Sequence, residues 1–413
     1  MVSAIVENKE LKGEIAAIAD ESLLKTLLIL LSLNSGGIIS NYQRTKKIEN
    51  LVFGLNQLGA DIVINDEVID IFPISKKEYQ IDLKNDLELT RYMMGLSFFS
   101  FDKTKLINPK IPKICKKLFF EYAKYSKVRI HSLRGKMEID SKNMDKNYLP
   151  FEGIEGSFFA APFIISAASF GIEFLAVMDD YNSTLREIYD VANAFDIAEY
   201  EYFFDENKRS FFVAQKYFRE EKEIELPPSV KFSMYYLAAL LLNGKGRVKI
   251  PTTLYYPEIK LIENISHKIK KYPNFFEIEN KEEEFEFPSE IKPQGMSYFL
   301  PILFILGTKA KKTFKIGPFV PYKQKKLKEL EEFASQLVEI GAKIKYVDNY
   351  FEISPSKLYG GIIEPSGEYN TMAAIIAGII CKSPLKVKNI EQAVVKNKNF
   401  IDDLKKLEAS IKI

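Results

Sequence analysis

The stretch Gly367–Ser383 has the sequence GEYNTMAAIIAGIICKS. It begins with small and polar residues, continues with about three turns of mostly apolar residues, and ends before a proline. A helix that spans a membrane needs roughly twenty apolar residues, and this segment is shorter. The pattern therefore predicts a helix that is buried inside a protein.

The same design recurs along the chain at a nearly constant interval. The starts of the copies lie roughly sixty-five to seventy-five residues apart, which indicates an internal repeat of one supersecondary unit. The five further copies are Ser22–Gly36, Asp86–Ser100, Gly156–Gly171, Ser229–Gly244 and Gly295–Lys309.

Each buried helix is followed by an amphipathic helix and then by two strands joined at a tight turn. In Ile48–Pro73, leucines at helical spacing precede two alternating apolar segments that flank Asn65–Asp66. Leu330–Pro355 repeats this order around Asp348–Asn349. The chain thus predicts six βαβαββ-type repeats and an α/β (α+β) fold.

The sixth repeat stops after one strand, and the apolar segment Val2–Glu7 is the expected partner of that strand. This pairing would join the two ends of the chain in one domain. We therefore expect a terminal domain made of residues 1–14 and 227–413 and an inserted domain of residues 15–226. Each domain would hold three parallel buried helices inside a ring of sheets and outer helices.

The composition excludes several classes of protein. The chain has 413 residues, of which 46% are hydrophobic and 28% charged, with a net charge of +2, as expected of a soluble protein with no global nucleic-acid or membrane signal. No signal-peptide pattern opens the sequence, and its two cysteines lack metal-ligand spacing. These features predict a cytoplasmic location without a membrane partner, and they leave a monomer or a homodimer open.

The first turns of the buried helices are the expected functional positions. A helix N-terminus carries partial positive charge and unpaired N–H groups, so several such ends aimed into one cleft form an anion site. The expected ligand is a small phosphorylated or carboxylated molecule in a cleft between the domains.

Four segments, in order, resemble the motifs of the enolpyruvyl transferases, and within that family those of the 3-phosphoshikimate 1-carboxyvinyltransferases (EPSP synthases). The resemblance covers essentially the whole chain and implies a two-domain inside-out α/β barrel. It also implies transfer of an enolpyruvyl group from phosphoenolpyruvate to 3-phosphoshikimate, without metal or organic cofactor. The segments are Leu11–Gly36, Asn85–Leu96, Gly367–Ile379 and Val394–Leu407.

Most of the chemistry that the resemblance implies is replaced in this sequence. The family lysine that grips both substrates aligns with Glu21, and an arginine of the same motif aligns with Thr26. The aspartate that serves as a base aligns with Gln294, which cannot take up a proton. The Asp-His-Arg triplet is replaced by Glu368–Asn370. These losses argue against ordinary family catalysis.

Several polar residues remain as candidate ligand-binding groups, and no catalytic residue is assigned. Arg91 is either a ligand group or part of a structural ion pair. Ser22 and Ser157 are either helix N-caps or phosphate contacts. The candidates are Ser22, Lys25, Asn85, Arg91, Ser157, Lys323, Lys326 and Lys396.

Three functional interpretations follow. The first is a relative that has lost enolpyruvyl transfer and serves as a binding or interaction protein. The second is an active EPSP synthase with a rearranged site. The third is a polyanion or nucleic-acid binder that uses Lys309–Lys328, a run without acidic residues that alternatively balances the acidic segment Glu279–Glu286.

Overall fold

The computed structural model describes residues 2–74, 80–100, 102–145, 147–178, 182–214, 220–319, 324–395 and 397–413. The chain divides into two compact units. The terminal unit consists of Met1–Ile18 and Pro227–Ile413, and the inserted unit is Ala19–Leu226. The first crossing thus lies after Ile18 and not after residue 14, the position expected from the sequence.

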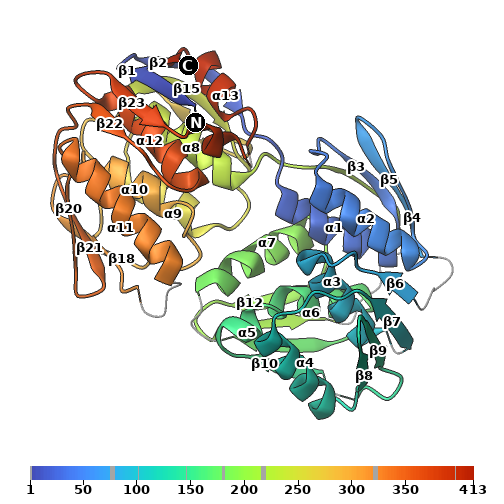
Figure 1. Cartoon of the computed structure of the whole chain (residues 1–413). Helices are drawn as coiled ribbons and strands as arrows, with labels where there is room; N and C mark the ends of the chain where they lie inside the picture. The colour runs from blue at the N-terminus through green and yellow to red at the C-terminus, as the bar shows by residue number, and fades with distance from the viewer. Residues whose placement is uncertain are drawn as a thin grey trace. The chain divides into compact units, whose positions relative to one another are not determined.

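Among the described residues, each unit holds three four-stranded sheets of one topology (Figure 1). In every sheet one edge strand is parallel to its neighbour and the other neighbours are antiparallel. In one sheet, for example, β14 is parallel to β3, and β3, β5 and β4 are antiparallel in turn. The predicted repeat of two helices and a hairpin is confirmed. The three sheets of the inserted unit are β14(Lys222–Glu225)-β3(Gly37–Ser40)-β5(Val68–Phe72)-β4(Asp61–Ile64), β6(Gln80–Asp82)-β7(Lys103–Ile107)-β9(Lys136–Asp140)-β8(Arg129–Leu133) and β10(Tyr148–Phe151)-β11(Phe174–Met178)-β13(Ser210–Val213)-β12(Tyr202–Asp205).

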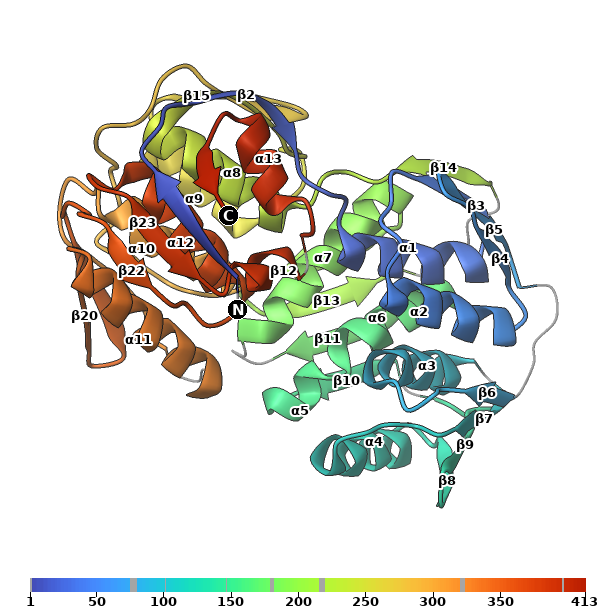
Figure 2. The same ribbon diagram turned by 45° about the horizontal axis from the view of Figure 1, so that its top comes forward.

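The sheets of the terminal unit draw on both ends of the chain. Strands from the first sixteen residues enter two of them, next to strands from the second half of the sequence (Figure 2). They are β16(Ile269–Tyr272)-β17(Phe275–Ile278)-β15(Gly244–Lys249)-β2(Leu11–Ala16), β18(Glu290–Ile291)-β19(Phe314–Ile316)-β21(Tyr350–Ser354)-β20(Lys343–Val347) and β22(Gly361–Ile363)-β23(Leu385–Lys388)-β1(Ser3–Glu7)-β24(Ser410–Lys412).

The six apolar stretches form buried helices, as predicted. In the terminal unit the three inner helices contact one another, and in the inserted unit α6 contacts both α1 and α3. The inner helices are α1 (Glu21–Leu33), α3 (Leu87–Phe99), α6 (Ala160–Ser169), α8 (Val230–Asn243), α10 (Leu300–Gly307) and α12 (Glu368–Ile380).

The outer helices are amphipathic and pack one face on the sheets and inner helices. In α2, for example, Ile48, Leu51 and Leu55 are buried at helical spacing, whereas Lys46, Lys47 and Asn56 are exposed. The outer helices are α2 (Lys46–Gln57), α4 (Lys113–Tyr125), α7 (Asn182–Ala198), α9 (Pro257–Ile265), α11 (Gln324–Glu339) and α13 (Phe400–Lys406), with the shorter α5 (Gly153–Ser157) and the 3₁₀ helix η1 (Ile390–Val394).

The predicted hairpin turn at Asp348–Asn349 has the backbone that such a turn requires. Both residues have positive φ, 51° and 66°, and Val347 pairs directly with Tyr350. Asparagine and aspartate tolerate this left-handed conformation better than most residues, which explains their choice here.

Candidate functional site

Helix α1 begins at a carboxylate cap. Asp20 Oδ1 accepts hydrogen bonds from the backbone N–H groups of Ser22 (2.8 Å) and Leu23 (3.2 Å). An aspartate at this position satisfies the unpaired N–H groups and also complements the positive end of the helix dipole. The interpretation of Ser22 as the N-cap is therefore wrong, because Asp20 fills that role.

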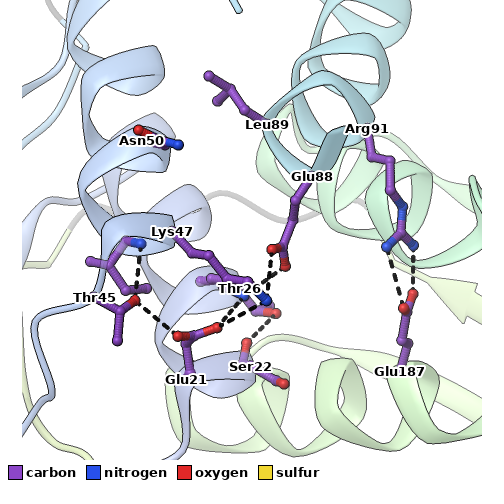
Figure 3. Close-up of polar contacts among 12 residues, drawn as sticks. Glu21, Ser22, Thr26, Thr45, Lys47, Asn50, Glu88, Leu89, Arg91 and Glu187 are labelled. Atoms are coloured by element: carbon purple, nitrogen blue, oxygen red, sulfur yellow. Dashed lines mark hydrogen bonds and ion pairs between the residues drawn. The ribbon is translucent and has the colours of Figure 1, made fainter. Parts of the chain in front are cut away.

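Near the start of α1 a buried lysine, Lys25, lies between two glutamates from different helices. Figure 3 labels the two glutamates, Glu21 and Glu88. Lys25 Nζ lies 2.6 Å from Oε1 of Glu21 and 2.6 Å from Oε1 of Glu88, and the Lys25 side chain is only 6% exposed. Lys47 Nζ lies 3.4 Å from Glu88 Oε2, and Thr45 Oγ1 donates to Glu21 Oε2 at 2.9 Å. We call these five residues the lysine–glutamate cluster.

Lys25 and Glu88 shift each other's pKa values in opposite directions. Burial by itself lowers the pKa of Lys25, but the carboxylates of Glu88 and Glu21 outweigh it and raise the pKa above its usual value. Burial raises the pKa of Glu88, and the ammonium of Lys25 outweighs that effect, so the net pKa of Glu88 is lowered. Lys25 and Glu88 are therefore both charged at neutral pH, and each charge offsets the other.

Arg91 is held in a second internal ion pair. Its Nη1 and Nη2 atoms lie 3.3 and 2.6 Å from the two carboxylate oxygens of Glu187 on α7, and its Nε donates to the carbonyl of Phe158 at 2.8 Å. The guanidinium carbon also lies 5.1 Å from the centre of the Phe158 ring. Of the two interpretations of Arg91, the structure shows the ion pair.

Asn85 and Ser157, two further candidate residues, lie just before α3 and at the end of α5. Asn85 is exposed, has a φ of 54°, and donates its backbone N–H to the carbonyl of Asn108 just before α3. Ser157 is the last residue of α5, and the N-cap of α6 is Phe159, so the interpretation of Ser157 as an N-cap is wrong. The chain forms a separate short helix there, and the long apolar helix begins later than expected.

The terminal unit has a hollow of about 330 Å³ at the first turns of two of its inner helices, α10 and α12. Lys326 lines it together with Glu329 on α11 and with Pro301 and Glu368 from the first turns of α10 and α12. The first N–H group of the α12 cap, at Gly367, already donates to Gln392 Oε1 at 2.6 Å. In this hollow, too, carboxylates accompany the basic candidate residue.

Two candidates, Lys323 and Lys396, lie outside the described residues. Sequence reasoning missed Glu88 and Glu187, the two acids that neutralise Lys25 and Arg91. They lie 63 and 96 residues away from these partners, so no local spacing connects them. An acidic residue in the first turn of a buried helix was the available signal for Glu88.

Three lysines in the described part of the basic run Lys309–Lys328 are engaged within the protein. Lys309 Nζ donates to the carbonyls of Leu242 (2.7 Å) and Glu282 (3.2 Å), and Lys311 pairs with Glu286. Lys315 Nζ lies 2.9 Å from Glu352 Oε1. These contacts favour the interpretation that the run balances nearby acidic residues.

Across the residues that the structure describes, no group of three or more His, Cys, Asp or Glu side chains is arranged to hold a metal ion. The helices in the described part of the chain are each too short or too polar to cross a membrane.

No family model matches the chain. A stretch of 202 residues, 45% of this chain, is 26% identical to a UDP-N-acetylglucosamine 1-carboxyvinyltransferase of Fervidobacterium nodosum. A stretch of the same length is 24% identical to a 3-phosphoshikimate 1-carboxyvinyltransferase of Bacillus cytotoxicus. These matches span 44% and 47% of the relatives, less than half of their length.

The solved structures that resemble this one cover nearly the whole chain. The enolpyruvyl transferase NikO from Streptomyces tendae matches 99% of this chain and 98% of its own, with a TM-score of 0.71 at 12% identity. An EPSP synthase from Acinetobacter baumannii matches all of both chains, with a TM-score of 0.75 at 10% identity. The chain thus has the enolpyruvyl transferase fold. The resemblance inferred from the sequence is confirmed at the level of the fold.

Proposed function

We propose that this chain is a relative of the enolpyruvyl transferases that no longer transfers the enolpyruvyl group and acts as a binding or interaction protein. The lysine–glutamate cluster carries this proposal. Two lysines, Lys25 and Lys47, face two glutamates, Glu21 and Glu88, so the cations at the start of α1 are neutralised by the protein itself.

An anionic substrate would have to compete with these carboxylates. A phosphate group that approaches Lys25 meets Glu21 and Glu88 at hydrogen-bond distance from the same ammonium, and like charges that close repel. Each charge-assisted contact that the substrate displaces is worth about 1.5–3 kcal/mol. The Arg91–Glu187 pair presents a second such barrier.

The chain lacks a titratable side chain at the position where the resemblance places the base of the family reaction. Gln294 stands where the resemblance places the base, and an amide does not accept a proton at neutral pH. The family reaction needs a group that exchanges a proton in the transition state. We therefore expect the chemical step to fail even if both substrates bind.

The proposal is tested by incubating the purified chain with phosphoenolpyruvate and 3-phosphoshikimate and following phosphate release and the enolpyruvyl product by NMR. We expect no product above the background without protein. Turnover at about 1 s⁻¹ or faster, the range of ordinary enzymes, would overturn the proposal and support an active enzyme with a rearranged site.

A charge-removal variant tests the observation on which the proposal rests. In Glu21→Gln/Glu88→Gln the two lysines lose their acidic partners, so we expect the affinity for 3-phosphoshikimate in calorimetry to rise about tenfold or more. The matched control is Glu67→Gln/Glu223→Gln, which makes the same charge change at two exposed residues of the same unit. Equal gains in both variants, or no gain in either, would show that the cluster does not limit anion binding.

A further inference from the structure

We propose that a second hollow of the terminal unit binds a compact polyphosphate group. It has a volume of about 730 Å³, within the range of ordinary small-molecule sites. We call it the lysine hollow, after the lysines that line it, Lys309, Lys343, Lys357 and Lys382.

The lysine hollow is separate from the hollow that Lys326 lines. It lies where the inner helices end, because Thr308 directly follows α10 and Ile380 is the last residue of α12. The hollow lined by Lys326 lies instead at the first turns of the same helices. The two sites can therefore be tested independently, and this proposal does not rest on the proposed function.

Three of the four lysines remain available to a ligand. Lys343, Lys357 and Lys382 are exposed and make no ion pair within the described part of the chain. Lys309 is instead occupied by two backbone carbonyls, and burial lowers its pKa, so we do not count it as a ligand group. Three unpaired ammonium groups around one hollow favour a ligand with several negative charges.

The rim of the hollow is fixed by the backbone. The N–H of Tyr359 donates to the carbonyl of Ile340 at 2.8 Å, and the N–H of Lys382 donates to the carbonyl of Leu358 at 3.0 Å. Leu358 itself is 3% exposed and anchors the loop that carries Lys357. The backbone that carries the lysines is thus already ordered before a ligand binds. Less conformational entropy is therefore lost on binding.

Tyr359 and a glycine hold one of the lysines in place. Lys382 Nζ lies 4.9 Å from the centre of the Tyr359 ring, close enough for a cation–π contact. Gly341 has a φ of 112°, and a Cβ there would approach Tyr359 Cδ2 to 2.6 Å, so only glycine lets the ring lie where it does.

Two acidic residues, Glu283 and Glu284, also line the hollow, and their negative charge opposes the binding of an anion. Glu283 pairs with Lys281 at 3.4 Å, and Glu284 is exposed. The four lysines and two glutamates that line the hollow leave a net charge of +2 (4 − 2). Removing the charge of Glu284 should therefore strengthen the binding of a polyanion.

The experiment is calorimetric titration of the full chain with tripolyphosphate at low salt. We expect a Kd below about 1 mM that weakens as salt is added. In Lys343→Gln/Lys357→Gln/Lys382→Gln the affinity should fall at least about tenfold, and in Glu284→Gln it should rise about twofold to fivefold. The control Lys260→Gln/Lys292→Gln/Lys405→Gln removes three exposed lysines elsewhere in the same unit and should leave the affinity within about twofold.

Each other outcome counts against the proposal. Equal weakening in the two triple variants would show non-specific attraction to the whole unit, and absence of saturation would show that there is no site. Tighter binding of a short single-stranded oligonucleotide that is lost in the first triple variant would assign the hollow to nucleic acid. The melting temperature of Lys343→Gln/Lys357→Gln/Lys382→Gln should match that of the natural chain, which verifies that its loss of affinity does not come from unfolding.

Discussion

At the scale of single residues, the start of α1 shows how side chains of the protein itself can satisfy a helix N-terminus. Asp20 caps the helix, and Glu21 and Glu88 hold Lys25 by two 2.6 Å contacts. These carboxylates occupy the electrostatic role that a bound anion has at other helix N-termini. The protein therefore stabilises this position with its own side chains.

The buried lysine gives the first prediction on stability. In Lys25→Met, Glu21 and Glu88 face each other without the intervening cation, so we expect the free energy of unfolding to fall by about 2–4 kcal/mol. The control is Lys47→Met, because Lys47 is 55% exposed, and it should cost less than about 1 kcal/mol. Urea denaturation measures both, and equal losses would mean that burial of the pair does not matter.

The lowered pKa of Glu88 gives a prediction on pH. A carboxyl whose pKa is lower in the folded state adds stability above its unfolded pKa of about 4.3, and this contribution disappears as the pH falls through the folded value. We therefore expect Glu88→Gln to be less stable than the natural chain at pH 7 and to lose less stability on acidification to pH 4.

Denaturation curves at the two pH values, with Glu67→Gln as the exposed control, check this expectation. The control should lose as much stability on acidification as the natural chain does. If Glu88→Gln loses the same amount too, Lys25 does not govern the titration of Glu88.

At the scale of elements, the inner helices α3 and α6 approach each other closely at a glycine. A Cβ on Gly95 would lie 2.8 Å from the carbonyl oxygen of Pro162 and 2.8 Å from Ser166 Oγ. Aromatic rings pack around the same two helices, with Phe98 and Phe163 at 4.8 Å between ring centres. Close packing of this kind leaves no room for an added methyl group.

We expect Gly95→Ala to lower the free energy of unfolding by about 1–3 kcal/mol, because the methyl group would press on the backbone of α6. Gly54→Ala in α2 is the matched control. Its Cβ would meet the flexible ends of Leu89 and Met93, which can move, and alanine favours the helix by about 1 kcal/mol. Thermal unfolding compares the two variants, and a smaller loss for Gly95→Ala than for Gly54→Ala would contradict the packing argument.

At the scale of the whole molecule, the N-terminal strand completes the last repeat of the terminal unit. Strand β1 pairs antiparallel with β23 on one side and with β24 on the other, and its residues Ala4 and Val6 are buried. Strands from opposite ends of the sequence thus depend on each other for their hydrogen bonds.

Deletion of residues 2–7 should therefore leave the facing edges of β23 and β24 unpaired. We expect hydrogen exchange to accelerate in Leu385–Lys388 and Ser410–Lys412, while the sheets of the inserted unit keep their protection. The control is removal of Ile413, which is 68% exposed and has no partner in the register of β1 and β24. It should leave hydrogen exchange unchanged in both strands. Unchanged exchange in β23 after the deletion would contradict the role of β1.

The sequence by itself determined the repeated architecture of this protein. Apolar residues at helical spacing, as in Gly367–Ser383, and turn residues such as Asp348–Asn349 act over a few positions, so their pattern can be recognised locally. Only the tertiary structure decided what the retained cations do. Lys25 and Arg91 meet Glu88 and Glu187 across 63 and 96 residues, and charges attract according to their distance in space, which no spacing along the chain records.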